Sequence, residues 1–252
     1  HIELFSYFQG DVISVEEWIR RMMKLYGDNG RMMVAWYLST LFHDIIFPEH
    51  HKGFPILNAF GPPYKGKSTA IYSIAAMFGK PRKPINISNV TPYGMSVRQM
   101  QSRCALVSVS EYLNSIEMFK IQVLKSQYDG VGRERGSTEK KNSSEQTPVL
   151  NAVTLDGQHL PTRDIALLTR CITLEFNHYD DSEDAKKLFE EQVALENTGK
   201  LSQITSSLMQ FRDLVKDNMA RKLTEVKSDL RQFVGNVKEE RILINHAIPL
   251  AV

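Results

Sequence analysis

The sequence predicts an α/β fold: a parallel β-sheet flanked by helices, with a helical segment before it and a helical region after it. Three observations support this prediction. Apolar runs of strand length alternate with segments of helical period through the middle of the chain. A glycine-rich loop, Gly61–Ser68, separates the first of these runs from a helix. The two ends of the chain have helical periodicity alone. We therefore expect three parts, at residues 1–50, 51–178 and 179–252.

The first part is expected to contain two helices within residues 14–47. Ser14 is a suitable N-cap, because the acidic residues Glu16 and Glu17 follow it in the first turn. Large apolar residues then recur at helical spacing on both sides of a breaker cluster, Gly27–Gly30. At this spacing we interpret the methionine and tryptophan side chains as core residues rather than as a ligand-binding box.

The middle part alternates strands and helices in an order that favours a parallel sheet. Strands are expected at residues 54–60, 85–87, 104–109, 148–154 and 171–176, and helices at residues 68–78, 95–103, 117–127 and 165–170. A polar stretch rich in glycine, serine and charge, residues 129–147, is expected to form a loop or a hairpin. The pattern from Asp184 to the end is helical again.

The composition is that of an ordinary globular protein, with 42% hydrophobic and 24% charged residues. A formal charge of +2 argues against a polyanion-binding surface over the whole molecule, so any nucleic-acid contact must come from a local cluster. The two cysteines lack the spacing of a zinc site. The apolar run Met32–Phe42 is too short to span a bilayer, so we expect a soluble, cytoplasmic protein with no membrane partner. Because the chain starts at His1 in mid-pattern, we expect a piece of a longer protein.

The loop Gly61–Ser68 has the pattern Gly-x-x-x-x-Gly-Lys-Ser, which predicts a binding site for a nucleoside triphosphate. Its glycines permit backbone angles that let successive N–H groups converge on phosphate oxygens, and the following helix presents its positive N-terminus to them. Lys67 is expected to reach the β- and γ-phosphates, and the Ser68 hydroxyl to ligate Mg²⁺. The alternative is a turn without a ligand. The residues expected to contact ATP are Gly61, Pro62, Tyr64, Lys65, Gly66, Lys67, Ser68 and Thr69.

Hydrolysis of a nucleotide needs an acid near the γ-phosphate that orients water and helps to hold Mg²⁺. Glu111 is the candidate, because it follows the apolar run 104–109 at the carboxyl end of a predicted strand, where parallel sheets place ligands. The usual motif ends in Asp-Glu, and here Ser110 replaces the first acid. This replacement puts the Mg²⁺ affinity and the turnover in question. The alternative interpretation is that Glu111 only caps a helix.

A basic cluster within residues 125–141 is a candidate nucleic-acid contact. Its positive residues lie among glycines and serines, which suits phosphate-backbone contacts that need charge more than shape. Glu134, Glu139 and Glu145 dilute this charge, so a solvated loop is the alternative. The residues expected to bind DNA are Lys125, Arg133, Arg135, Lys140 and Lys141.

Two further positions after the predicted strand at 148–154 are candidates for the reaction. A polar residue there, Gln158 or Asp156, would sit between the phosphate loop and the acid-bearing strand and could sense the γ-phosphate. Arg170 closes a short helix, a place from which an arginine can reach into the nucleotide of a neighbouring subunit. Alternatively, Arg170 pairs with a local carboxylate such as Asp164 or Glu175. The candidate catalytic residues are Lys67, Glu111, Gln158 and Arg170, and the candidate metal ligands are Ser68 and Glu111.

The order of these parts resembles the AAA+ ATPases. Within that family it is most similar to the superfamily 3 helicases and to the helicase domains joined to primases in phages and mobile elements. The likeness covers about residues 30–178 and includes the phosphate loop, Glu111, Gly157–Pro161 and Ala166–Cys171. It implies a ring, usually a hexamer, with ATP between subunits. It also implies that residues 124–136 form a hairpin that points into a central channel and grips single-stranded DNA.

The resemblance therefore favours an ATP-dependent DNA helicase or translocase module that acts in the replication of a phage or mobile element, with a primase partner or a fused primase domain. A second hypothesis is an ATP-binding loader or assembly switch with little hydrolysis, which Ser110 would suit. A small-molecule kinase ranks third, because only Arg163 and Arg170 could supply the lid arginines that it needs. The region after Asp180 departs from the family pattern, and we expect a lid, an oligomerisation collar or a docking surface there.

Overall fold

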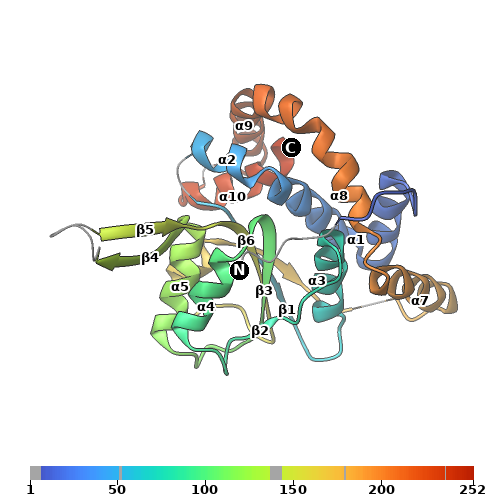
Figure 1. The fold of residues 1–252 in the computed structure, drawn as a ribbon, viewed down its shortest axis with the longest axis horizontal. Helices are drawn as coiled ribbons and strands as arrows, with labels where there is room; N and C mark the ends of the chain where they lie inside the picture. Colours follow the sequence, from blue (N-terminus) through green and yellow to red (C-terminus); the bar gives the residue numbers. More distant parts are fainter. Residues whose placement is uncertain (1–6, 51–52, 137–143, 179, 236) are drawn as a thin grey trace.

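The sheet at the centre of the molecule contains five parallel strands (Figure 1). The computed structural model describes residues 7–50, 53–136, 144–178, 180–235 and 237–252. The strands are β1 (Ile56–Phe60), β2 (Ile85–Asn86), β3 (Arg103–Tyr112), β6 (Leu150–Gly157) and β7 (Cys171–Glu175). Their order across the sheet is β2-β3-β6-β1-β7, and every pair of neighbours runs parallel. The predicted parallel α/β sheet is therefore confirmed.

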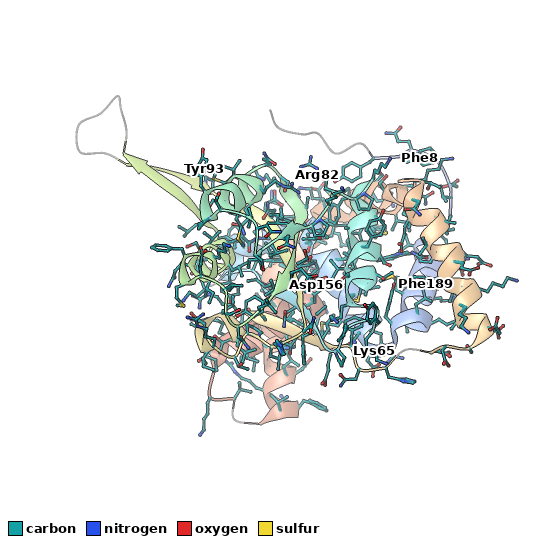
Figure 2. All side chains as sticks on the ribbon, turned by 90° about the horizontal axis from the view of Figure 1, so that it is seen from below. Phe8, Lys65, Arg82, Tyr93, Asp156 and Phe189 are labelled. Atoms are coloured by element: carbon teal, nitrogen blue, oxygen red, sulfur yellow. The ribbon has the colours of Figure 1, made fainter. Side chains whose placement is uncertain are left out.

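Helices connect the strands as the periodicity predicts, and the polar stretch forms a hairpin. The connecting helices are α3 (Lys67–Ala75) with the 3-10 turn η1 (Ala76–Phe78), α4 (Pro92–Met100), α5 (Met118–Tyr128) and α6 (Ile165–Leu168). In the hairpin, β4 (Val131–Gly136) pairs antiparallel with β5 (Ser144–Pro148). Two views of the molecule show this hairpin extending well beyond the body of the protein (Figures 1 and 2).

The N-terminal segment forms one long kinked helix, α1 (Val15–Leu41), followed by α2 (His43–His50). Ser14 caps α1 as predicted, because its hydroxyl accepts a 3.0 Å hydrogen bond from the Glu17 amide. The breaker cluster was expected to separate two helices, but the helix resumes at once. Only Gly27 leaves the helical region, with φ 56° and ψ −131°, a conformation that glycine adopts readily.

Two hydrophobic clusters cover the two faces of the sheet. The cluster on one face combines side chains of α1, α3 and the C-terminal helices with Leu57 and Ala59 of β1. The cluster on the other face combines α4 and α5 with Ile56 of β1. Trp18, Met22, Met33, Trp36 and Tyr37 of α1 are buried in the first cluster, where the Trp36 indole donates a 2.9 Å hydrogen bond to the Pro55 carbonyl. These methionine and tryptophan side chains are therefore core residues, as the sequence predicts.

The C-terminal region is helical as predicted, and it packs on the same core as the N-terminal segment. Its elements are α7 (Glu183–Asn197), α8 (Ser202–Leu208), the 3-10 turn η2 (Met209–Phe211), α9 (Arg212–Val234) and α10 (Glu240–Ala251). Arg212 of α9 forms a 2.7 Å ion pair with Asp44 of α2. Because all three predicted parts share one cluster, their bounds at residues 50 and 178 stay a prediction. Among the described residues, no helix is both long and apolar enough to cross a membrane.

Candidate nucleotide-binding site

The phosphate loop lies between the end of β1 and the start of α3, so the predicted order of strand, loop and helix is confirmed. Three of its residues have positive φ: Gly61 (141°), Tyr64 (62°) and Gly66 (82°). A Cβ on Gly61 would lie 2.4 Å from the Phe176 carbonyl oxygen, so no other residue fits there without a shift of the backbone. Gly66 is the N-cap of α3, whose first-turn N–H groups are those that bind anions in other phosphate loops. The loop therefore has the backbone of a phosphate cradle.

Lys67 folds back over this loop. Its ammonium group donates a 2.5 Å hydrogen bond to the Pro62 carbonyl oxygen, and the residue is 8% exposed. Burial lowers the pKa of Lys67, and the carboxylates of Asp156 and Glu111 oppose that shift. The positive charge of Lys67 is thus held close to the loop, where the acids of β6 and β3 act on it.

Ser68 and Asp156 join the phosphate loop to the centre of the sheet. The Ser68 hydroxyl donates a 2.7 Å hydrogen bond to Asp156 Oδ2. Asp156 lies on β6 opposite Ala59 of β1, and it is 6% exposed. Figure 2 shows Asp156 in the middle of the molecule and Lys65 of the loop at its rim. Burial raises the pKa of Asp156, and the Ser68 hydroxyl, the Glu111 amide and the Lys67 ammonium act against that rise.

Glu111 lies at the carboxyl end of β3, where the sequence places it. Its φ is 63°, in the left-handed region, within an irregularity of strand pairing between Val109 and Tyr112. Such a backbone costs on the order of 1–3 kcal/mol for a non-glycine residue and occurs most often at functional sites. The side chain is exposed, and its charge acts on both Lys67 and Asp156. Its role in hydrolysis stays a prediction.

The two remaining candidate reaction residues lie in different surroundings. Gln158 is exposed just beyond the end of β6, and no described contact links it to the phosphate loop. Arg170 is held within the chain: it pairs with Asp129 at 3.1 Å, donates to the Ala166 carbonyl and lies over the Tyr128 ring. Its partner is therefore neither Asp164 nor Glu175. A role for Arg170 in a neighbouring subunit stays a prediction.

The predicted DNA contacts separate into three groups. Lys125 forms a 2.9 Å ion pair with Asp164, in which the side chains are 15% and 10% exposed. This pair joins α5 to the start of α6 and neutralises the charge of Lys125. Arg133 and Arg135 lie on β4 of the extended hairpin. The last two, Lys140 and Lys141, fall outside the described residues.

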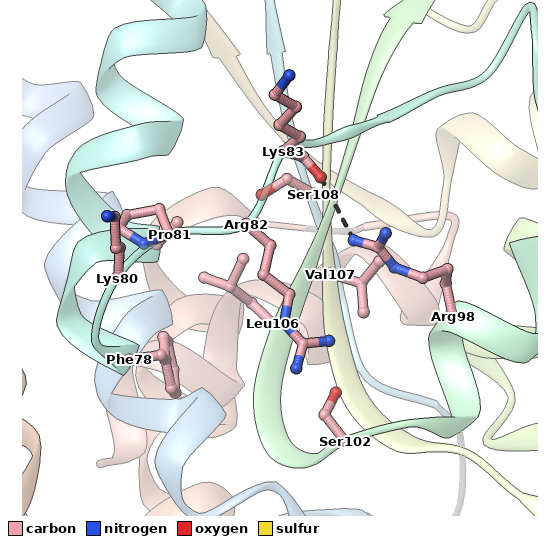
Figure 3. A pocket seen from close by; sticks show the side chains of 11 residues that line it. Phe78, Lys80, Pro81, Arg82, Lys83, Arg98, Ser102, Leu106, Val107 and Ser108 are labelled. Atoms are coloured by element: carbon pink, nitrogen blue, oxygen red, sulfur yellow. Dashed lines mark hydrogen bonds between the residues drawn. The ribbon is translucent and has the colours of Figure 1, made fainter. Parts of the chain in front are cut away.

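A second basic region, which the sequence did not single out, lines a hollow beside β3. Figure 3 shows Arg82 and Arg98 approaching it from two segments, with a 3.3 Å hydrogen bond from Arg98 to the Lys83 carbonyl. Lys80 and Lys83 complete the basic lining, and both are exposed. Because β2 pairs with only the last part of β3, this hollow lies along an open strand edge. Lysine and arginine side chains commonly protect such edges from pairing with other chains.

The residues at the phosphate loop fit a nucleoside triphosphate with Mg²⁺. The cradle of backbone N–H groups and the Lys67 ammonium match the charge of the phosphates, and Mg²⁺ prefers the oxygen ligands that Ser68, Asp156 and Glu111 offer. Such a cation would neutralise charge on the phosphates. Sequence reasoning named Asp156 only as an alternative sensor and missed its contact with Ser68. A charged residue in an otherwise buried strand was the signal that could have found it.

Comparisons with known proteins give a shared fold. No protein-family model matches the chain, and no curated protein matches it in sequence. Among solved structures, SCCmec type IV Cch, described as an active helicase, is similar with a TM-score of 0.66 over 97% of this chain at 16% identity. This chain spans about half, 47%, of that protein. A JCV helicase structure with a bound acetamide compound aligns over 89% of this chain and 67% of that chain at 12% identity. Its TM-score, 0.35, is low. This chain therefore shares its α/β fold with part of Cch over nearly its whole length.

Proposed function

We propose that this chain is the ATP-dependent motor module of a DNA helicase or translocase. The observation that carries the proposal is the loop at the end of β1, which has three residues with positive φ, Lys67 over it, and the Ser68 hydroxyl bonded to a buried acid. The shared fold with an active helicase supports the same conclusion, because the likeness covers nearly all of this chain.

The proposed module is of the AAA+ type, works as a ring, and acts in the replication of a phage or mobile element, together with a primase partner or a fused primase domain. In a ring, ATP would lie between subunits, with Lys67 and Glu111 of one subunit on one side. Arg170 would serve the neighbouring site if it left its pair with Asp129, whose side chain is 42% exposed. A hexamer is the expected assembly.

The hairpin of β4 and β5 is the proposed DNA contact. It extends beyond the body of the molecule, as a segment that reaches into a channel must, and its sequence carries Arg133 and Arg135 (Figure 1). Positive side chains on such a ribbon suit the phosphate backbone of a single strand, whose binding weakens strongly as salt increases.

The experiment is to measure the ATPase rate of the assembled protein with and without single-stranded DNA. We expect stimulation by DNA that disappears at high salt. The double variant Arg133→Ala/Arg135→Ala should lose the stimulation. The matched control is Lys80→Ala/Lys83→Ala, which removes the same charge from the exposed hollow beside β3 and should keep it. If neither DNA nor RNA changes the rate of the assembled wild type, the motor proposal fails.

An ATP-binding loader or assembly switch is the second candidate, because Ser110 leaves β3 without its buried acid. Such a protein would bind ATP and hydrolyse it very slowly. Single-turnover hydrolysis separates the two: hydrolysis that stays very slow with and without DNA would favour the switch, and hydrolysis that DNA accelerates would favour the motor.

A further inference from the structure

The end of β3 lacks the buried carboxylate that would support a metal ion. Ser110 occupies that position, and its hydroxyl lies 3.5 Å from the Ile85 carbonyl oxygen of β2. Because β2 is the neighbour of β3 on the side away from β1, this hydroxyl is directed away from the phosphate loop. Glu111 follows with an exposed side chain. The β3 strand therefore offers one exposed acid and no buried one.

The strand register puts an acid beside this gap. Val109 of β3 pairs with Leu155 of β6 and Tyr112 pairs with Gly157, so Asp156 is the one residue of β6 that stands opposite both Ser110 and Glu111. Asp156 also pairs with Ala59 of β1, the strand that leads into the phosphate loop. The buried acid at this end of the sheet therefore lies on β6, one strand nearer than β3 to β1 and the phosphate loop.

We propose that Asp156 is the positioning carboxylate for nucleotide-bound Mg²⁺, and that it fulfils from β6 the role that Ser110 cannot fulfil on β3. The proposal rests on the proposed function, because it assumes that the loop binds a triphosphate. Asp156 would act through Ser68, whose hydroxyl it already accepts at 2.7 Å.

The hydrogen bond from Ser68 to Asp156 orients the serine oxygen for a cation. A serine hydroxyl has one proton, and donating it to Asp156 leaves the oxygen lone pairs free to face a cation. Outer carboxylates that orient a metal ligand in this way typically change metal affinity about 10-fold to 100-fold when they are removed. In addition, the charges of Asp156 and Glu111 both act on the single Lys67 ammonium, which leaves a net negative charge that a divalent cation would offset.

A purely structural role is the competing explanation, in which Asp156 only fastens the first turn of α3 to the sheet. The two explanations differ in one measurable quantity, which is the dependence of nucleotide affinity on Mg²⁺. A structural fastening affects the affinity for ATP equally with and without the cation. A positioning carboxylate affects only the gain in affinity that Mg²⁺ provides.

The experiment measures the affinity of the wild-type chain and its variants for a fluorescent ATP analogue, in EDTA and across a series of Mg²⁺ concentrations. Asp156→Asn keeps the size and a hydrogen-bond acceptor, and we expect it to bind the analogue in EDTA at least as tightly as wild type. The Mg²⁺ concentration that gives half of the gain should rise about tenfold or more. The control Ser110→Ala should behave as wild type.

A rescue variant tests the strand-to-strand exchange itself. Ser110→Asp combined with Asp156→Asn returns an acid to β3, and it should recover most of the Mg²⁺ dependence if thermal melting shows that both variants are folded. An unchanged Mg²⁺ series for Asp156→Asn, or an equal loss in EDTA and in Mg²⁺, would overturn the inference while wild type still binds ATP. If wild type itself binds no nucleotide, it is the proposed function that fails.

Discussion

Asp156 and Asp164 lie close together in the sequence, but Asp156 is buried and Asp164 is half-buried, and their surroundings are opposite. Asp156 accepts a hydrogen bond from a neutral hydroxyl, that of Ser68. Asp164 pairs with the Lys125 ammonium at 2.9 Å and caps α6 through the Leu167 amide. Burial raises the pKa of Asp156. Burial also acts to raise the pKa of Asp164, but the hydrogen bonds from Lys125 and from the Leu167 and Ala166 amides, together with the Lys125 charge, outweigh burial and lower the pKa.

This contrast distinguishes the acid that stabilises the fold, Asp164, from the acid that is available for a ligand, Asp156. Asp164 is neutralised by a direct partner, so its charge contributes to folding stability. The charge of Asp156 has no direct cationic partner among the contacts described, so keeping it ionised inside the protein costs folding free energy. An acid that costs stability at a phosphate loop is the kind of feature that function maintains. Variants of these two acids and of Glu111 separate the two roles.

The largest effect should come from the exposed acid beside Asp156. We expect Glu111→Gln to leave the affinity for ATP within about threefold of wild type and to slow single-turnover hydrolysis by about 100-fold or more, because the amide cannot act as a base toward water. Quenched-flow hydrolysis with direct binding as the control measures both. Hydrolysis at the wild-type rate would remove Glu111 from the mechanism.

Next in size is the loss of stability when the structural acid is neutralised. Asp164→Asn should lower the free energy of unfolding by about 2 kcal/mol, because it leaves the half-buried Lys125 ammonium without its charged partner. The Mg²⁺ dependence of ATP affinity should not change. Urea unfolding measures the first quantity, and the second is the control. A variant as stable as wild type would show that the pair contributes nothing to the fold.

The stability difference between wild type and Asp164→Asn should also depend on pH. A carboxyl whose pKa is lowered in the folded state stabilises the fold above its unfolded pKa, near 4, and loses this contribution as pH falls through the folded value. We therefore expect the difference of about 2 kcal/mol at pH 7 to shrink steadily below about pH 4. A difference that stays constant down to pH 3 would indicate packing rather than charge as its source.

The smallest effect is expected from neutralising the other acid. Asp156→Asn removes a charge whose pKa is raised by burial, so at neutral pH the ionised wild-type side chain opposes folding. The free energy of unfolding without nucleotide should therefore equal or slightly exceed that of wild type. Thermal and urea unfolding in EDTA check this. A loss comparable to that of Asp164→Asn would mean that Asp156 has a structural role after all.

The phosphate loop and the sheet could be predicted from sequence because their signals are local. Gly61 and Gly66 are needed where the backbone turns left-handed, and each apolar run reports the burial of its own strand. The contact between Ser68 and Asp156 could not be predicted in this way. It depends on the order of strands, which places β6 between β1 and β3, and no local pattern encodes that order.

Other differences have similar causes. Arg170 pairs with Asp129, which follows the end of α5, although 41 residues separate the two in the sequence. Asp164, which is only six residues from Arg170, pairs with Lys125 instead. Lys125 looked like a free charge in a basic cluster, but α5 turns it toward α6, where Asp164 neutralises it. Gly27 shows the opposite case: the glycine signal was correct, but a single left-handed residue was enough to bend the helix without ending it.

Isothermal titration of ATP into this chain shows directly whether the loop after β1 is a triphosphate site. We predict one site per chain in the presence of Mg²⁺, weaker binding in EDTA, and loss of binding in Lys67→Ala, which removes the ammonium held over the loop. Circular dichroism would establish that the variant is folded. Equal affinity of wild type and folded Lys67→Ala, or no binding by wild type, would contradict the account.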